Sequence, residues 1–116
     1  MVPALLTGAA ILWALATPAT ALAQTTMADI VKWCSNYPDP SGNDRLCNLY
    51  VGETVNLLRS TDPVIHGGQR VCVPTDTPVA RIVPIFMSWV EANRQAMSPR
   101  LIENLAAALK DRYPCP

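Results

Sequence analysis

Apolar side chains recur every three to four residues along four stretches of the chain, the spacing that places them on one face of an α-helix. The first stretch follows Thr26, a suitable helix cap, and ends at Cys34 before a segment rich in proline. The second runs from about Asp44 to Arg59, with Asn43 as its predicted cap. Two neighbouring stripes follow this helix: Leu46, Tyr50, Thr54 and Leu57 on one, and Cys47, Val51, Val55 and Leu58 on the other.

Two further helices are predicted in the last third of the sequence. Thr77 and Pro78 have the character of a cap and a first helical residue, and Ser98 repeats this signal before the fourth helix, which is predicted to reach Tyr113. Pro84 lies inside the third helix and should bend it, because proline lacks the N–H that bonds one turn back. The inward positions are Val79, Ile82, Val83, Phe86 and Val90 in the third helix, and Leu101, Ile102, Leu105, Ala108 and Leu109 in the fourth.

The segment between the second and third predicted helices has no helical periodicity. From Ser60 to Asp76 it contains two proline positions and a pair of glycines, which predict an irregular loop with a short extended stretch at Arg70 to Val73. The fold class is therefore all-α, a small four-helix domain.

Residues 1–23 have the character of a secretory signal peptide. From Val2 onward the segment has no charged side chain, and it closes with Ala21-Leu22-Ala23, a small-x-small cleavage pattern. Cleavage after Ala23 would leave a single domain of residues 24–116, in which no segment is long and apolar enough to cross a bilayer. The alternative is a retained membrane anchor, because no lysine or arginine precedes the apolar run.

Four cysteines in an exported chain of this size predict two stabilising disulfides. Short connections make consecutive helices antiparallel, so a tight turn brings Cys34 near Cys47. The same reasoning places Cys72, before the third helix, near Cys115, after the fourth. The predicted pairs are Cys34 with Cys47 and Cys72 with Cys115. A metal site is disfavoured, because there is no Cys-x-x-Cys pair and His66 is the sole histidine.

Charge and composition argue against several function classes. Nine basic and nine acidic residues give a net charge of zero, which disfavours nucleic acid as a partner. No spacing selects a base for a serine nucleophile, and the carboxylates are scattered. We therefore expect a binding protein without enzymatic activity and without a cofactor.

Four elements of the sequence resemble the Tai-type immunity proteins of bacterial type VI secretion. They are Trp33-Cys34, Cys47-x-x-Tyr50-Val51, Cys72-Val73-Pro74 and the ending Tyr113-Pro114-Cys115 with the alanines before it. Two positions depart from the pattern. Further glycines are expected beside the Tyr-Val element, but Leu49 and Glu53 flank it here and only Gly52 remains. In addition, Pro84 lies inside the third helix. These departures concern the partner surface more than the fold.

The resemblance implies a periplasmic helical protein that binds a secreted cell-wall amidase and blocks its active site. Homodimers occur among the proteins it resembles, so self-association is a second implied interaction. The alternative interpretation is a periplasmic stress protein with chaperone-like activity, similar in size and cysteine use to small acid-activated chaperones. Acid-dependent exposure of apolar surface would mark the chaperone, whereas an inhibitor should act on one partner at neutral pH.

An inhibitor that fills a cleft needs an adaptable element on a rigid frame, and the segment from Ser60 to Arg70 has this character. Its predicted partner-binding residues are Asp62, His66, Gly67, Gly68 and Arg70. The shorter link from Asn93 to Met97 is the alternative contact, and a plain connector is the alternative role for the longer one.

Overall fold

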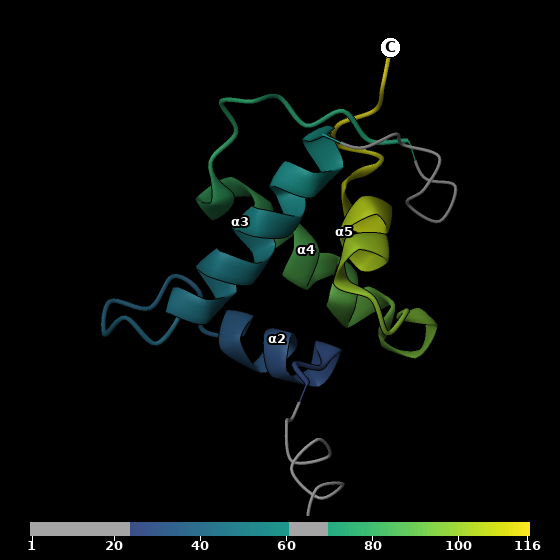
Figure 1. Ribbon diagram of the computed structural model, residues 1–116. Coiled ribbons are helices and arrows are strands. Elements are labelled where there is room, and N and C mark those ends of the chain that lie inside the picture. The colour runs from purple at the N-terminus through teal and green to yellow at the C-terminus, as the bar shows by residue number, and fades with distance from the viewer. Residues whose placement is uncertain (1–23, 61–69) are drawn as a thin grey trace, which may run out of the picture.

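The computed structural model describes residues 24–60 and 70–116, and in these ranges it contains four α-helices, one short 3-10 helix and no strand (Figure 1). This confirms the all-α fold class. The elements are α2 (Met27–Cys34), α3 (Arg45–Ser60), α4 (Val79–Ala92), η3 (Arg94–Ala96) and α5 (Leu101–Leu109). None of the described helices is long and apolar enough to span a membrane.

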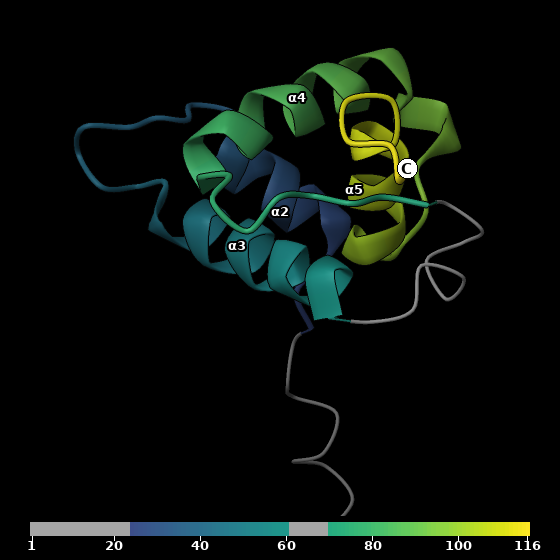
Figure 2. The ribbon, with the colours of Figure 1, turned by 90° about the horizontal axis from the view of Figure 1, so that it is seen from above.

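The four α-helices surround one apolar core. Both α2 and α5 contact α3 and α4, and α3 also contacts α4 (Figure 2). The largest fully buried side chains in this core are Phe86 and Ile82 from α4 and Leu105 and Leu109 from α5, all 0% exposed. Trp33 and Tyr50 lie at the edge, with ring centroids 5.5 Å apart. The inward positions predicted for the third and fourth helices thus build the core or pack against it.

Helix α2 begins with a capping box that confirms Thr26 as its cap. The Thr26 hydroxyl accepts from the Asp29 N–H at 3.2 Å, while the Asp29 carboxylate accepts from the Thr26 N–H at 2.9 Å. The backbone bond from Thr26, followed by its hydroxyl, lowers the pKa of Asp29 below the ordinary value of 3.8. Each partner therefore holds the other in the geometry that starts the helix.

The start of α3 differs from the prediction at its cap. The helix begins at Arg45, within one residue of the expected start, but Asn43 does not cap it and instead donates to the Ser41 hydroxyl at 3.0 Å. The Asp44 carboxylate accepts from the Asp39 N–H at 2.8 Å. The backbone reverses direction at Gly42, whose φ of 87° suits a residue without a Cβ.

Of the two stripes predicted on α3, one faces the core. Cys47, Val51, Val55 and Leu58 are buried. The other stripe is divided: Thr54 is buried and Tyr50 half-buried, whereas Leu46 and Leu57 are 42% and 51% exposed. Helix α3 packs against α2, α4 and α5 through one face, so the neighbouring stripe lies partly outside this contact.

Helix α4 starts one residue later than expected. Pro78 occupies the cap position with no side-chain bond, so the prediction that Thr77 caps this helix is wrong. The carbonyl of Thr77 has another role, because it accepts from the Arg59 guanidinium at 3.2 Å. The helix continues through Pro84, whose side chain is exposed. A Cβ at Gly52 would lie 3.3 Å from the Val79 side chain, so this one glycine permits close contact between α3 and α4.

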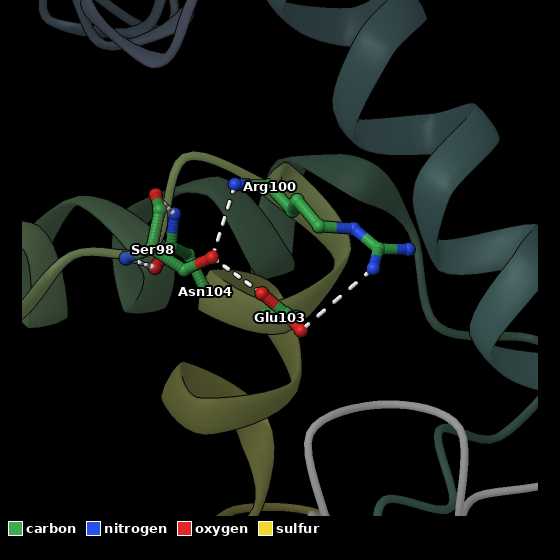
Figure 3. Close-up of polar contacts among 4 residues, drawn as sticks. All are labelled: Ser98, Arg100, Glu103 and Asn104. Atoms are coloured by element: carbon green, nitrogen blue, oxygen red, sulfur yellow. Dashed lines mark hydrogen bonds and ion pairs between the residues drawn. The ribbon is translucent and has the colours of Figure 1, made fainter.

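A polar cluster of four residues shapes the start of α5 (Figure 3). The Ser98 hydroxyl accepts from the Arg100 N–H at 3.1 Å and donates to the Glu103 carboxylate. Asn104, 2% exposed, accepts from the Ser98 N–H and donates to the Ser98 carbonyl, both at 2.8 Å. The prediction that Ser98 caps the fourth helix and Pro99 begins it is therefore wrong, because Arg100 occupies the cap position and the first helical residue is Leu101. Ser98 instead orders the turn before the helix through its bonds to Arg100, Glu103 and Asn104.

The end of α5 corrects the expected length of the fourth helix. The helix stops at Leu109, and Tyr113 is reached through a turn in which its N–H donates to the Leu109 carbonyl at 2.9 Å. Residues after the turn pair with an extended segment: Val71 and Pro114 form an isolated antiparallel bridge. Within the extended stretch predicted at Arg70 to Val73, the structure therefore shows one bridged residue, Val71, and no strand.

Both predicted disulfides are present. Cys34 pairs with Cys47 and Cys72 with Cys115, with Cα–Cα distances of 5.0 and 4.9 Å. No cysteine is free. The hairpin reasoning that paired the cysteines is confirmed, since each bridge joins the adjacent ends of two consecutive helices or the segments beside them.

Candidate partner-binding site

Of the predicted partner-binding residues, Arg70 is described by the structure, and its side chain is exposed. Asp62, His66, Gly67 and Gly68 lie outside the described residues. What the structure does define is the frame that holds the two ends of this segment, at Ser60 and at Arg70. The frame has three parts: an arginine of α3, a bridge to the end of the chain and two surface hollows.

The guanidinium of Arg59 connects the last turn of α3 to the segment before α4. It donates to the carbonyls of Pro74 at 2.7 Å, Thr77 at 3.2 Å and Val73 at 3.4 Å. Another of its nitrogens donates to the Asn56 side chain at 3.0 Å. Arginine suits this position because its planar group presents several N–H donors in fixed directions. The Val73-Pro74 element is therefore held against α3.

The other part of the frame ties residues 71–72 to residues 113–115. The Cys72 N–H donates to the Tyr113 carbonyl at 2.8 Å, and this bond belongs to the antiparallel bridge between Val71 and Pro114. The disulfide between Cys72 and Cys115 closes the same contact covalently. We call this bridge, together with the disulfide, the C-terminal latch.

Two hollows of about 410 Å³ each lie on the surface of the frame. One lies beside the latch, and its walls include Leu58, Val71 and Cys72. The other lies between α3 and the start of α4, and its walls include Leu49 and Val79. Arg59 lines both hollows. The face around Arg59 is thus an uneven surface to which α3, the start of α4 and the segment between them contribute.

The alternative contact, from Asn93 to Met97, contains the 3-10 helix η3. Asn93 donates to the Trp89 carbonyl at 2.8 Å, and Arg94 forms an exposed ion pair with Glu91 at 2.8 Å. The link is therefore a short ordered turn with polar side chains. Its role as a contact stays a prediction.

The described residues contain no group of acidic, histidine or cysteine side chains arranged to hold a metal ion. The polar cluster at Ser98 and Glu103 is the one closest in composition to a nucleophile with a base. Its bonds are instead those of a helix start, since the serine hydroxyl both accepts from the backbone and donates to the carboxylate.

Sequence reasoning missed Arg59 as part of the frame. The residue lies at the predicted end of the second helix, where a basic side chain is explained by the helix dipole alone. Two prolines and a cysteine follow in the loop, and a segment with prolines leaves carbonyls without regular partners. That combination is the signal that could have indicated a long-range role for this arginine.

We predict that Arg59→Ala lowers the free energy of unfolding by about 1–3 kcal/mol, because carbonyls of the 73–77 segment lose a charged donor. Arg59→Lys should restore only part of this loss. Lysine keeps the positive charge, but its ammonium group cannot bond several carbonyls at once as the planar guanidinium does. Chemical denaturation measures both. The control is Arg81→Ala on the exposed side of α4, expected to change stability by less than about 0.5 kcal/mol. Equal effects at both arginines would contradict the role of Arg59.

The family of the chain follows from a comparison with models of known families. The model for Rap1a immunity proteins matches residues 18–115, which include all four helices and both disulfides. The chain belongs to the Rap1a immunity protein family. Rap1a proteins are a type VI secretion immunity family, so the partner implied for this member is a protein toxin. No curated protein and no solved structure matches the chain.

Membership in the Rap1a family also bears on the other expectations. Proteins of this family are generally non-enzymatic inhibitors and are typically periplasmic. The match begins at residue 18, inside the predicted leader, and ends at Cys115. The helical core, the frame around Arg59 and the C-terminal latch of this Rap1a protein thus all lie within the part that the family shares.

Proposed function

We propose that this chain is an exported immunity protein that binds a peptidoglycan amidase toxin in the periplasm and occludes its active site. The observation that carries the proposal is the family match over residues 18–115. The leader expected at residues 1–23 and two formed disulfides fit an oxidising compartment. The amidase as target and cleavage after Ala23 are the finer parts of the proposal.

The proposed inhibitory element is the segment between Ser60 and Arg70, with Asp62, His66, Gly67, Gly68 and Arg70 as its contact residues. What supports this choice is the frame described above: Arg59 lies directly before the segment and Cys72 follows it closely. Anchoring both ends reduces the conformational entropy that a binding element loses in a complex. A polar segment on such a base could present an imidazole, a carboxylate and a guanidinium to a catalytic centre.

Protection of living cells tests the function. A strain lacking this gene should be lysed by sister cells that deliver the toxin, and a plasmid carrying the complete chain should restore survival. A plasmid whose product starts at Gln24 should not restore it, because that product lacks the signal for export. Protection by both plasmids would contradict action in the periplasm, and survival of the deletion strain would contradict a role in immunity.

We predict that deletion of His66 to Gln69 weakens binding to the toxin at least about tenfold, which corresponds to about 1.4 kcal/mol. The deletion removes proposed contacts but leaves Arg59 and the latch in place, so circular dichroism should show an unchanged helical content. Binding is measured by calorimetry with the purified toxin.

The matched control for this deletion lies in the alternative contact. Arg94→Ala removes an exposed ion pair and should leave affinity unchanged. If the loop deletion binds as tightly as the parent while Arg94→Ala weakens binding, the contact lies at Asn93 to Met97 instead. The chaperone-like alternative has no specific observation in its favour, and the family match favours the inhibitor.

A further inference from the structure

The two disulfides of this domain lie in opposite environments. Cys34 and Cys47 are 2% and 0% exposed and form part of the apolar core. Cys72 is exposed and Cys115 half-buried, and Cys72 also lines a surface hollow of about 410 Å³. A thiolate must reach a sulfur atom in order to exchange with a disulfide, so the two bridges differ in access to a reductant.

The exposed bridge fastens a small and well-defined part of the molecule. It closes the C-terminal latch, in which the Cys72 N–H donates to the Tyr113 carbonyl and Val71 pairs with Pro114. In both ribbon views the last residues of the chain run beside the segment that precedes α4 (Figures 1 and 2). One isolated bridge is a weak contact by itself, because a lone pair of extended segments gains little from its hydrogen bonds.

The rest of the fold has attachments that do not pass through this bridge. Arg59 holds the carbonyls of Val73, Pro74 and Thr77 from the side of α3. Helix α5 is anchored by Leu105 and Leu109, both 0% exposed, and contacts α3 and α4. The loss of the latch therefore leaves the helical core and the Val73-Pro74 element with their own contacts.

We propose that the Cys72–Cys115 disulfide is a redox-sensitive latch, opened by a dithiol reductant while Cys34–Cys47 stays closed and the helices persist. One thiolate of the reductant attacks a sulfur of the bridge, and the other cysteine leaves as a thiolate and takes up a proton. The second thiol of the reductant then displaces the first cysteine and closes a disulfide within the reductant. The protein gains two electrons and two protons, and the dithiol is oxidised.

Opening the latch has a local consequence for the surface that faces a partner. Arg70 lies two residues before Cys72 and is the one proposed contact residue within the described part of the chain. Release of Cys115 frees residues 70–72 from residues 113–115. The backbone that carries the Arg70 side chain is then no longer held in one position. The inference itself depends on the exposure of the two bridges and not on the identity of the toxin.

Reduction followed by trapping tests the proposal. The oxidised protein is treated with dithiothreitol at about pH 8, where this class of thiol is partly ionised, samples are quenched with an alkylating agent, and modified cysteines are located by mass spectrometry. We expect a species alkylated at Cys72 and Cys115 alone, formed at least about tenfold faster than any product alkylated at Cys34 or Cys47. Circular dichroism of this species should match that of the oxidised protein.

Hydrogen exchange on the trapped two-thiol species locates the opening. The Cys72 amide should lose protection, whereas the Thr77 amide, which donates to the Pro74 carbonyl at 3.1 Å, should keep it. Simultaneous alkylation of all four cysteines, faster reaction at Cys34 and Cys47, or loss of helical signal in the two-thiol species would each overturn the proposal.

A double variant gives a second, independent comparison. Cys72→Ala with Cys115→Ala removes the latch without a reductant, and it should remain helical and reduce its Cys34–Cys47 bridge as slowly as the parent does. A variant that is unfolded, or in which Cys34–Cys47 reduces at least about tenfold faster, would show that the core depends on the latch and would overturn the proposal.

Discussion

Phe86→Ala is expected to lower the free energy of unfolding by about 3–5 kcal/mol, a large share of the stability of a domain this small. The ring is 0% exposed and lies on the inward face of α4 beside Ile82 and Val90, which are also fully buried. Its removal leaves a cavity lined by side chains from packed helices, and such a cavity closes only in part. Urea denaturation followed by circular dichroism measures the change.

A matched truncation on the surface separates burial from side-chain size. Leu49→Ala removes an apolar side chain that is 53% exposed, and it should cost less than about 1 kcal/mol. If Phe86→Ala were as mild as Leu49→Ala, Phe86 could not be the centre of the core. A Phe86→Leu variant should fall between the two, because it refills most of the cavity.

Asn104→Asp is the second substitution with a large expected effect, about 3 kcal/mol or more at neutral pH. The change is nearly isosteric, so packing is preserved and the charge dominates. The Asn104 amide donates to the Ser98 carbonyl at 2.8 Å, and a carboxylate would place negative charge against that oxygen in a site that is 2% exposed to solvent. The bond from the Ser98 N–H offsets a part of this cost.

The pH dependence gives this prediction a distinct sign. Burial without a cation raises the pKa of the introduced carboxyl above its unfolded value of about 3.9. The protonated acid can donate to the Ser98 carbonyl. The loss of stability relative to the parent should therefore be small at pH values below the unfolded pKa. It should grow as the pH rises through the higher folded-state pKa.

The control for Asn104→Asp is the same substitution at Asn48. There the amide oxygen only accepts, from the Tyr37 hydroxyl at 2.8 Å, and the side chain is exposed. Asn48→Asp should therefore change stability by less than about 0.5 kcal/mol at any pH above 5. Comparable defects at the two positions would mean that Asn104 is not the buried polar anchor of α5.

Much of this fold could be predicted because its signals are local. The Thr26 cap and the periodic apolar faces of α4 and α5 depend on side chains within one or two turns of each other. The cysteine pairs also followed from chain order, since short connections restrict which helix ends can meet. In each case residues that are close in the sequence, or a short connection between helices, determine the local structure.

The errors arose where a distant partner decides the outcome. The carbonyl of Thr77 binds Arg59 of α3, although the residue was expected to cap its own helix. The fourth helix ends at Leu109, and the residues after its last turn pair with the segment at Val71 and Cys72. The choice of the α3 stripe that faces the core likewise depends on the position of α4 and α5. Periodicity within a helix does not contain this information.

The family and the frame could be predicted to different degrees. Motifs around the four cysteines indicated a type VI immunity family, and the match over residues 18–115 establishes the Rap1a family. A long-range role for Arg59 had a weak signal in the sequence, but the carbonyls that it binds could not be predicted, because these contacts join residues up to eighteen positions apart. Carbonyls are present at every residue, so no side-chain pattern identifies the ones that are bound.

Titration of toxin activity is the most direct test of the proposed immunity function. A candidate amidase toxin, chosen because it kills the strain that lacks this gene, is incubated with increasing amounts of the disulfide-bonded domain, residues 24–116, and release of peptide stems from purified peptidoglycan is followed at neutral pH. The proposal predicts that cleavage falls to background once the domain is equimolar with the toxin, and that the Phe86→Ala variant is a weaker inhibitor to the extent that it is unfolded. Cleavage that continues unchanged at a large molar excess of folded domain would contradict it.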